Sequence, residues 1–178
     1  METAETEDDA SFLTIGIDKE VFAVPVEAVL EILDMRPIFR IPDAPAHLKG
    51  LIDVRGRAVP VIDLRVKLGL PVVAADTYTR IIVLEVPMGE RRLALGLVAD
   101  RVFEVIALNR QQIEPSPDIG MRWNSDYIHG IGRRRDSFVV IFDLGKLFSV
   151  DAAQLLKTPN SLPATAGDDP SPPAFQAA

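Results

Sequence analysis

The sequence predicts an all-β protein made of two small β-barrel subdomains. Short apolar segments recur along the chain, turns rich in Gly and Pro separate them, and one hairpin pattern occurs twice, about eighty residues apart. We predict that residues 11–157 form this folded body. A disordered acidic segment, residues 1–10, precedes it, and a disordered tail rich in Pro and Ala, residues 158–178, follows it.

The strands of the N-terminal part are short. In residues 13–17, large apolar residues alternate with Thr and Gly, as in a half-buried strand, and a polar turn leads into a second strand, Val21–Val24. Pro25 then precedes "VEAVLEIL", which is too short for a substantial helix, so we expect one helical turn that runs into a strand. Three prolines exclude a long helix in the next segment: Pro37, Pro42 and Pro45.

The centre of the chain carries three longer strand patterns. They cover Thr79–Val86, Arg91–Asp100 and Arg101–Leu108. The link between the first two, "PMGE", has the composition of a hairpin turn. These segments therefore extend the all-β prediction through the middle of the chain.

The repeated pattern is a hairpin that ends in an apolar strand, an Asp and a short helix. Its two copies are Gly50–Leu68, which passes through a charged turn, and Gly130–Leu147, which passes through the basic turn "RRRD". Asp63 and Asp143 stand at equivalent positions, where a carboxylate accepts the N–H bonds that the first helical turn leaves unsatisfied. We predict both as helix N-caps, and the repeat indicates two subdomains with a seam between them.

The composition excludes several functional classes. The 178 residues carry a formal net charge of −7, which repels a phosphate backbone, so we expect no nucleic-acid binding. Cysteine is absent, which excludes disulfides and Cys-ligated zinc. No apolar run approaches the roughly 20 residues of a membrane helix. The acidic N-terminus has no secretory signal pattern, so the cytoplasm is the expected location.

The candidate catalytic groups do not converge on a reaction. His47 and His129 do not have the spacing of metal ligands, and neither a GxSxG nucleophile motif nor a phosphate-binding glycine loop is present. We interpret Arg133–Arg135 as a solvated turn and Trp123 as a packing residue. We therefore predict no catalytic activity, no metal and no cofactor.

The seam between two barrels is the expected binding site. Grooves between subdomains often bind ligands or partners. The segment Gly96–Ile106 carries more valine and leucine than one buried strand face needs, so part of it should line this groove. For each valine taken alone, core packing is the competing interpretation.

Four sequence blocks, in this order, resemble the CheW family of coupling proteins in bacterial chemotaxis. The blocks are "FLTIGIDKEVFAVPVEAVLEI", "IPDAPAHLKGLIDVRGRAVPVIDLRVKLG", "LALGLVADRVFEVIAL" with "QIEPSP", and "YIHGIGRRRDSFVVIFDLGKLF". The resemblance covers Phe12–Phe148, and Lys49–Arg65 is its most specific piece.

This resemblance implies two five-stranded SH3-like β-barrels with short helices around a hydrophobic core. It also implies a non-enzymatic adaptor that joins the cytoplasmic tips of chemoreceptors to the regulatory domain of a CheA-type histidine kinase. Such an adaptor is recruited to receptor arrays at the inner face of the membrane without inserting into it. By position, the kinase-binding surface would include Leu13, Val26 and Val29. The receptor-binding groove would include Glu31, Arg55, Val98, Val102 and Val105.

One position departs from the family pattern, because Asp53 stands where the family usually has Asn. An Asp so near Arg55 would compete for its guanidinium if the two side chains paired, and the sequence leaves this open. Two alternatives to chemotaxis coupling also remain. One is an adaptor of a parallel chemosensory pathway that controls surface motility or a second messenger, and the other is a β-barrel that binds a small molecule in its groove.

Overall fold

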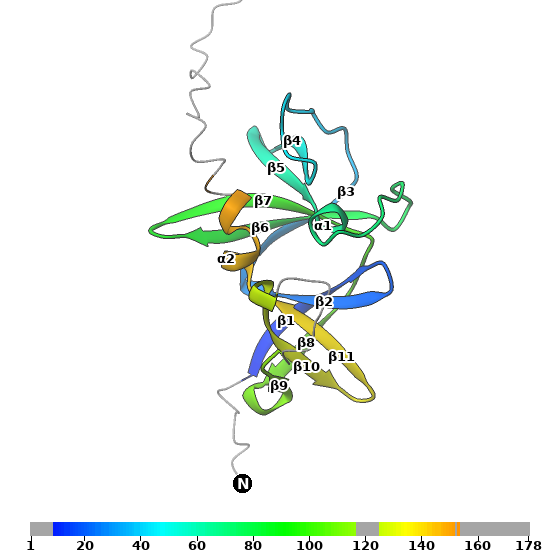
Figure 1. Ribbon diagram of the computed structural model, residues 1–178, viewed down its shortest axis with the longest axis vertical. Coiled ribbons are helices and arrows are strands. Elements are labelled where there is room, and N and C mark those ends of the chain that lie inside the picture. Colours follow the sequence, from blue (N-terminus) through cyan, green and yellow to red (C-terminus); the bar gives the residue numbers. More distant parts are fainter. Residues whose placement is uncertain (1–8, 117–124, 152, 154–178) are drawn as a thin grey trace, which may run out of the picture.

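The computed structural model describes residues 9–116, 125–151 and 153, which form two stacked, curled sheets (Figure 1). The strands are β1 (Asp9–Ile17), β2 (Glu20–Pro25), β3 (Val29–Asp34), β4 (Leu48–Val54), β5 (Arg57–Asp63), β6 (Arg80–Met88), β7 (Arg91–Ala99), β8 (Arg101–Asn109), β9 (Ile113–Glu114), β10 (Ile128–Arg134) and β11 (Ser137–Phe142). The helices are short: η1 (Val26–Ala28), α1 (Leu64–Lys67), η2 (Arg110–Gln112), η3 (Ser125–Tyr127) and α2 (Leu144–Leu147).

The two sheets share one topology. We call the sheet with the order β8-β1-β2-β11-β10-β9 subdomain 1, and the sheet with the order β3-β6-β7-β5-β4 subdomain 2. In each, an antiparallel hairpin (β1–β2 or β6–β7) lies beside a parallel strand (β11 or β5). The prediction of two small β-barrels is confirmed. Subdomain 1 has a sixth strand beyond the expected five, the two-residue β9, which pairs with β10.

The chain builds the two subdomains in different ways. Subdomain 2 is one continuous segment, because its five strands, β3 to β7, follow one another between residues 29 and 99. Subdomain 1 is discontinuous: β1 and β2 precede that segment, and β8, β9, β10 and β11 follow it. Figure 1 shows the blue strands β1 and β2 below, with the yellow β11, and the cyan and green strands of subdomain 2 above. Subdomain 2 is therefore inserted between β2 and β8 of subdomain 1.

The largest cluster of buried apolar side chains contains residues of both subdomains. Phe22 of β2 and Phe142 of β11 stack in it with ring centroids 4.7 Å apart and 5° between the ring planes. Leu64 of α1, Leu84 of β6 and Leu97 of β7 extend it into subdomain 2. A smaller apolar cluster fills each barrel separately. The seam is therefore itself a hydrophobic core, and separating the subdomains would expose it to water.

The hairpin repeat and its two caps are confirmed. The carboxylate of Asp63 accepts hydrogen bonds from two backbone N–H groups of α1, and that of Asp143 accepts one from α2. The backbone N–H of Asp63 also donates to the carbonyl of His47 at 2.7 Å, and that of Asp143 donates to the carbonyl of Tyr127 at 2.9 Å. The same local hydrogen bonds thus recur in the two copies.

Most strand boundaries agree with the sequence analysis within a few residues, and "VEAVLEIL" forms the expected helical turn followed by β3. β1 begins at Asp9, before the predicted start of the folded body, because Asp9 pairs with Asn109 of β8. The rest of the predicted N-terminal segment, the whole predicted tail and Trp123 lie outside the described residues.

Gly50 lets the linker before β4 close onto that strand. The backbone of Phe39 exchanges hydrogen bonds of 2.8 and 2.9 Å with Leu51, which covers part of the outer edge of β4. Gly50 has a φ of +143°, and a Cβ there would lie 1.9 Å from the carbonyl oxygen of Phe39. Only glycine allows this approach.

Gly50→Ala is therefore expected to destabilise the fold strongly. Gly56→Ala is the matched control, because Gly56 also has a positive φ but a Cβ there has no neighbour within 4 Å. We expect Gly56→Ala to cost about 1 kcal/mol for backbone strain. Gly50→Ala should cost roughly 3 kcal/mol or more, since strain and overpacking add. Urea unfolding of both variants measures the difference, and equal losses would contradict the close-approach explanation.

Candidate protein-docking groove

A groove opens at the mouth of subdomain 2, between its two edge strands. β3 and β4 lie at opposite ends of the sheet order, and the curl of the sheet brings them to the two sides of the groove. Its volume is about 210 Å³. The lining is apolar at the base and charged at the rim, with the residues Leu30, Glu31, Val54, Arg55, Arg57, Val59, Val83 and Ala94.

Arg55 lies in the two-residue turn between β4 and β5. Arg55 and Gly56 have φ values of 53° and 79°, as a tight type I′ hairpin turn requires. The carboxylate of Asp53 accepts a hydrogen bond from the backbone N–H of Gly56 at 2.8 Å. Arg55 instead forms an ion pair with Glu31 across the groove, with 3.5 Å between Nη2 and Oε1. Asp53 thus closes the turn, and Glu31 is the ionic partner of Arg55.

The Glu31–Arg55 pair is open to solvent. The Arg55 side chain is 81% exposed and the Glu31 side chain 31%. An ion pair this exposed contributes little to stability. The Arg55 guanidinium and the Glu31 carboxylate therefore remain open to contact with a partner.

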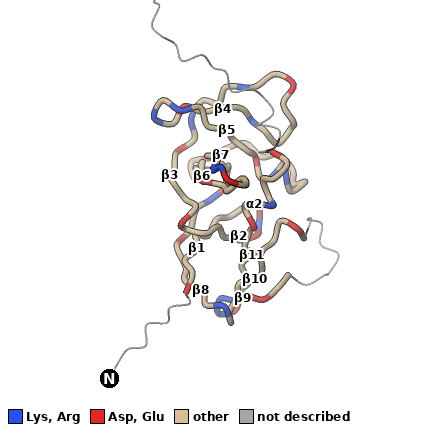
Figure 2. Tube along the Cα trace, turned by 90° about the vertical axis from the view of Figure 1, so that its left-hand side faces the viewer, with Lys and Arg blue, Asp and Glu red and all other residues tan. Residues whose placement is uncertain are grey.

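The structure does not gather all five predicted groove residues at this mouth. It brings Glu31 and Arg55 together, while Val98 is half-buried against the core of subdomain 2. Val102 packs against the central cluster, and Val105 is exposed on β8, the edge strand of subdomain 1. Figure 2 shows β3 and β8 on the same side of the molecule, so the exposed part of this set spans both subdomains.

The predicted kinase-binding residues have unequal access to solvent. Leu13 is 5% exposed and belongs to the central cluster, so little of its side chain is open to a partner in this structure. It is buried because β1 is an interior strand of its sheet, covered on both faces from Leu13 to Ile17. Val26 and Val29 are half-buried around η1 and keep part of their surface open.

Three exposed apolar residues were missed by the sequence analysis. Leu30 and Ile32 lie on the edge strand β3, and Leu30 lines the groove, whereas Phe103 lies on β8 and lines a second cleft, on the Asp100 side. For the two β3 residues, the pattern "VLEIL" contained the signal. Side chains of a strand alternate between its two faces, so Leu30 and Ile32, the neighbours of the half-buried Glu31, face solvent. Exposed apolar side chains on an unpaired edge strand favour contact with another protein.

A second arginine of the same sequence block has a structural role. Arg65 donates from Nε and Nη2 to the Asp100 carboxylate at 2.8–3.1 Å, and Nη2 lies 3.3 Å from Asp18 Oδ1. The hydrogen bonds to Asp100 raise the pKa of Arg65, although burial acts in the opposite direction. Since Asp18 belongs to the β1–β2 turn, this network ties α1 to subdomain 1.

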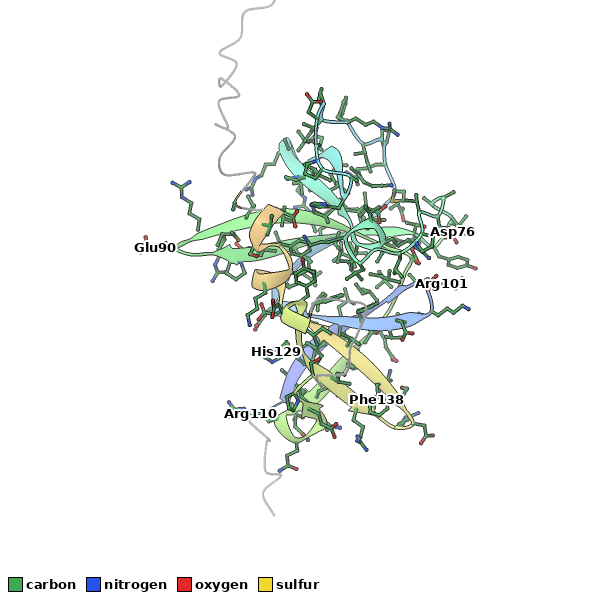
Figure 3. The ribbon with its side chains drawn as sticks, in the orientation of Figure 1. Asp76, Glu90, Arg101, Arg110, His129 and Phe138 are labelled. Carbon is green, nitrogen blue, oxygen red and sulfur yellow. The ribbon has the colours of Figure 1, made fainter. Side chains whose placement is uncertain are left out.

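The loop between α1 and β6 forms the wall of a second cleft, of about 240 Å³. Within the loop, the Asp76 carboxylate accepts hydrogen bonds from the backbone N–H groups of Tyr78 and Thr79, which lower the pKa of Asp76. The Arg101 guanidinium lies 4.6 Å from the centre of the Tyr78 ring. Figure 3 shows Asp76 and Arg101 close together at this edge of the molecule.

The two histidines do not form a common site. His47 precedes β4 in subdomain 2, whereas His129 lies on β10 in subdomain 1 (Figure 3). Across the described residues, no three His, Asp or Glu side chains are grouped so that they could hold a metal ion. The basic turn at Arg133–Arg135 is the exposed tip of the β10–β11 hairpin, as predicted. In the part of the chain that the structure describes, no helix has the length and apolar character to span a membrane.

Two curled sheets of one topology, which share a central apolar cluster, define the class of fold. The family model for the CheW-like domain matches residues 11–152, and the chain belongs to this family. The chemotaxis protein CheW of Klebsiella aerogenes is 32% identical over 145 residues, which cover 82% of this chain and 85% of that protein. CheW of Treponema pallidum is 26% identical over 153 residues, with 86% and 90% covered.

A solved structure agrees with this assignment. The scaffolding protein TtCheW from Thermoanaerobacter tengcongensis superposes with a TM-score of 0.72 and 27% sequence identity. The superposition covers 83% of this chain and 93% of that one. The resemblance found in the four sequence blocks is therefore confirmed for both the family and the fold.

The two arginines of the block should respond differently to truncation. Arg55→Ala is expected to change the free energy of unfolding by less than about 1 kcal/mol, because its ion pair is exposed. Arg65→Ala should cost about 2–3 kcal/mol, because it removes buried, charge-assisted hydrogen bonds. Thermal and urea unfolding of the two variants check this order. A larger loss for Arg55→Ala would show that the turn arginine is structural.

Proposed function

We propose that this chain is a non-enzymatic adaptor that couples chemoreceptors to a CheA-type histidine kinase in chemotaxis signalling. The observation that carries the proposal is the exposed Glu31–Arg55 pair at the rim of an apolar groove, next to the unpaired edge strand β3. A charged rim around an apolar base is the usual anatomy of a protein-docking site. Membership of the CheW-like family supports the choice of partners.

The receptor tip is the proposed occupant of the groove side. Arg55 and Glu31 would supply charge selection at the rim, and Leu30 and Val105 would supply exposed apolar contact on the edge strands of the two subdomains. Charged rims of this kind steer and orient a partner, while apolar anchors supply most of the affinity. A helical receptor tip lying along β3 and β8 would contact both subdomains at once.

The kinase regulatory domain is the proposed occupant of a second surface, around η1, which adjoins the receptor side at the start of β3. Val26 of η1 and Val29, the first residue of β3, are half-buried apolar residues of this surface. Two neighbouring surfaces that do not overlap would let the chain hold both partners together, which is what an adaptor needs. Its place of action would be the receptor arrays at the inner face of the membrane, and it would contribute contacts to the complex without any chemical step.

Charge reversal at the rim tests the receptor side of this proposal. We expect Arg55→Glu to weaken binding to a receptor-tip fragment about tenfold, equivalent to about 1.4 kcal/mol. Glu31→Arg alone should also weaken it, and the double variant should recover part of the affinity if the two charges act as a pair. Titration calorimetry or fluorescence polarisation with a labelled fragment measures these affinities.

The matched control is Arg92→Glu, which alters an exposed ion pair of the same subdomain, with Glu85, outside the groove. This control should bind the receptor fragment as the wild type does, and Arg55→Glu should still bind the kinase regulatory domain. The wild type should also change kinase autophosphorylation when receptors are present. If the wild type bound neither partner and left autophosphorylation unchanged, the proposed function would be wrong.

A further inference from the structure

A buried cluster of three ionisable side chains joins segments that are far apart in the sequence. The carboxylate of Asp151, which follows α2, contacts His47 Nε2 with one oxygen and lies 2.5 Å from Lys67 Nζ with the other. His47 lies in the linker before β4, and Lys67 is the last residue of α1. We call these three residues the clasp.

Two members of the clasp are closed to solvent. The side chains of Asp151 and Lys67 are only 3% and 7% exposed, whereas that of His47 is 23% exposed. The Lys67 ammonium also lies 5.6 Å from the ring centre of Tyr127 and 6.0 Å from that of Phe148. A buried carboxylate of this kind is tolerated only while the Lys67 ammonium and the His47 imidazole stay in place beside it. The clasp therefore has one well-defined arrangement and a strong penalty for leaving it.

The clasp joins the two subdomains. His47 and Lys67 belong to connections of subdomain 2, whereas Asp151 belongs to the segment that continues from β11 of subdomain 1. The Arg65 network described above acts beside it, because Asp18 belongs to subdomain 1 and Arg65 to the same short helix as Lys67. One short helix, α1, is thus held to subdomain 1 by two sets of ion pairs.

The internal repeat has no second clasp. In the second copy, Tyr127 stands at the position of His47 and Leu147 at the position of Lys67, so the equivalent positions carry no cations. Leu147 instead packs in the central apolar cluster. The first copy of the repeat therefore has an ionic contact where the second copy has apolar packing.

The helix α2, which precedes Asp151 in the chain, and the strand β3 lie on opposite faces of the molecule. Figure 1 shows α2 in front of the sheets and β3 behind them, and Figure 2 shows the same two elements on opposite sides. The groove is lined by residues of subdomain 2, among them Glu31 and Arg55, whereas Val105, the exposed residue of the same proposed receptor surface, lies on subdomain 1. A change in the angle between the subdomains would alter the spacing of these residues.

We propose that the clasp sets the angle between the two subdomains and thereby tunes the receptor surface, by setting the spacing between the groove of subdomain 2 and Val105 on subdomain 1. When a cation is removed, the buried Asp151 carboxylate must reach water, and the segment after α2 moves away from α1. The apolar central cluster keeps the subdomains together, so the seam shifts while each barrel stays folded. The effect on receptor binding rests on the proposed function, whereas the effect on the angle does not.

The test measures the subdomain angle and receptor affinity separately. The chain contains no cysteine, so Glu90→Cys in the β6–β7 turn and Asp136→Cys in the β10–β11 turn give one clean labelled pair, one residue on each subdomain. Nitroxide labels and pulsed electron spin resonance then report the distance distribution. Lys67→Leu, which installs the residue of the second repeat, is the test variant, and Lys67→Arg keeps the cation.

Lys49→Leu is the matched control, because Lys49 pairs with Asp63 at 3.6 Å within subdomain 2. We expect Lys67→Leu to broaden or shift the distance distribution and to weaken binding of the receptor-tip fragment about fivefold. Lys49→Leu should leave both unchanged, and Lys67→Arg should restore both. If Lys67→Leu does not fold, Asp151→Asn removes the buried charge with almost the same shape and takes its place.

An unchanged distance distribution in a variant with a lower melting temperature would overturn the proposal, since the clasp would then only stabilise the fold. A shifted distribution with unchanged receptor affinity would overturn the tuning of the receptor surface. If the wild type binds no receptor tip, the proposed function fails, while a shift in the partner-free distance measurement still supports control of the subdomain angle by the clasp.

Discussion

The insertion of subdomain 2 into the chain of subdomain 1 is the constraint on which the rest of the structure depends. Subdomain 1 takes β1 and β2 from one side of the insertion and its other strands from the other side, and subdomain 2 is the continuous segment between them. Apolar faces of the two sheets meet in one central cluster, with the stacked Phe22 and Phe142 rings inside it. Since neither subdomain buries this surface without the other, the two fold as partners, and the edge strands β3 and β8 face outward.

This constraint also separates structural from exposed charges. Where α1 meets subdomain 1, Arg65 and Lys67 are buried and held by Asp100 and Asp151. At the open mouth of subdomain 2, Arg55 is held only by an exposed contact with Glu31. The two arginines are ten residues apart in one sequence block, yet one maintains the arrangement of the subdomains and the other remains available for binding.

Local features of the fold were predictable from the sequence, because their causes lie within a few residues. The hairpin repeat, the caps Asp63 and Asp143 and the turn before β3 depend on neighbouring backbone groups and on alternation. Alternation shows which face of a strand is buried but not which sheet the strand joins, so the pairing of β3 with β6 was not predictable. The near-complete burial of Leu13 was not predictable for the same reason, since it depends on β1 being an interior strand.

Only part of the candidate site could be predicted from the sequence. Position within the family block pointed to Arg55 and Glu31, but their contact depends on the curl of a whole sheet. The sequence left open whether Asp53 pairs with Arg55. In the structure, the Asp53 carboxylate instead accepts a hydrogen bond from the nearby Gly56 N–H. The clasp could not be foreseen, because His47 and Asp151 are separated by more than a hundred residues. Such contacts follow from topology rather than from sequence pattern.

The central claim is that one chain holds a receptor and a kinase together through separate surfaces. Sedimentation of receptor-containing membranes with the kinase, in the presence and absence of the chain, tests it most directly. The account predicts that the kinase sediments with the membranes only when the chain is present, in a complex of all three. If receptor fragments instead displaced the kinase from the chain, the two partners would share one surface, and the account would be contradicted.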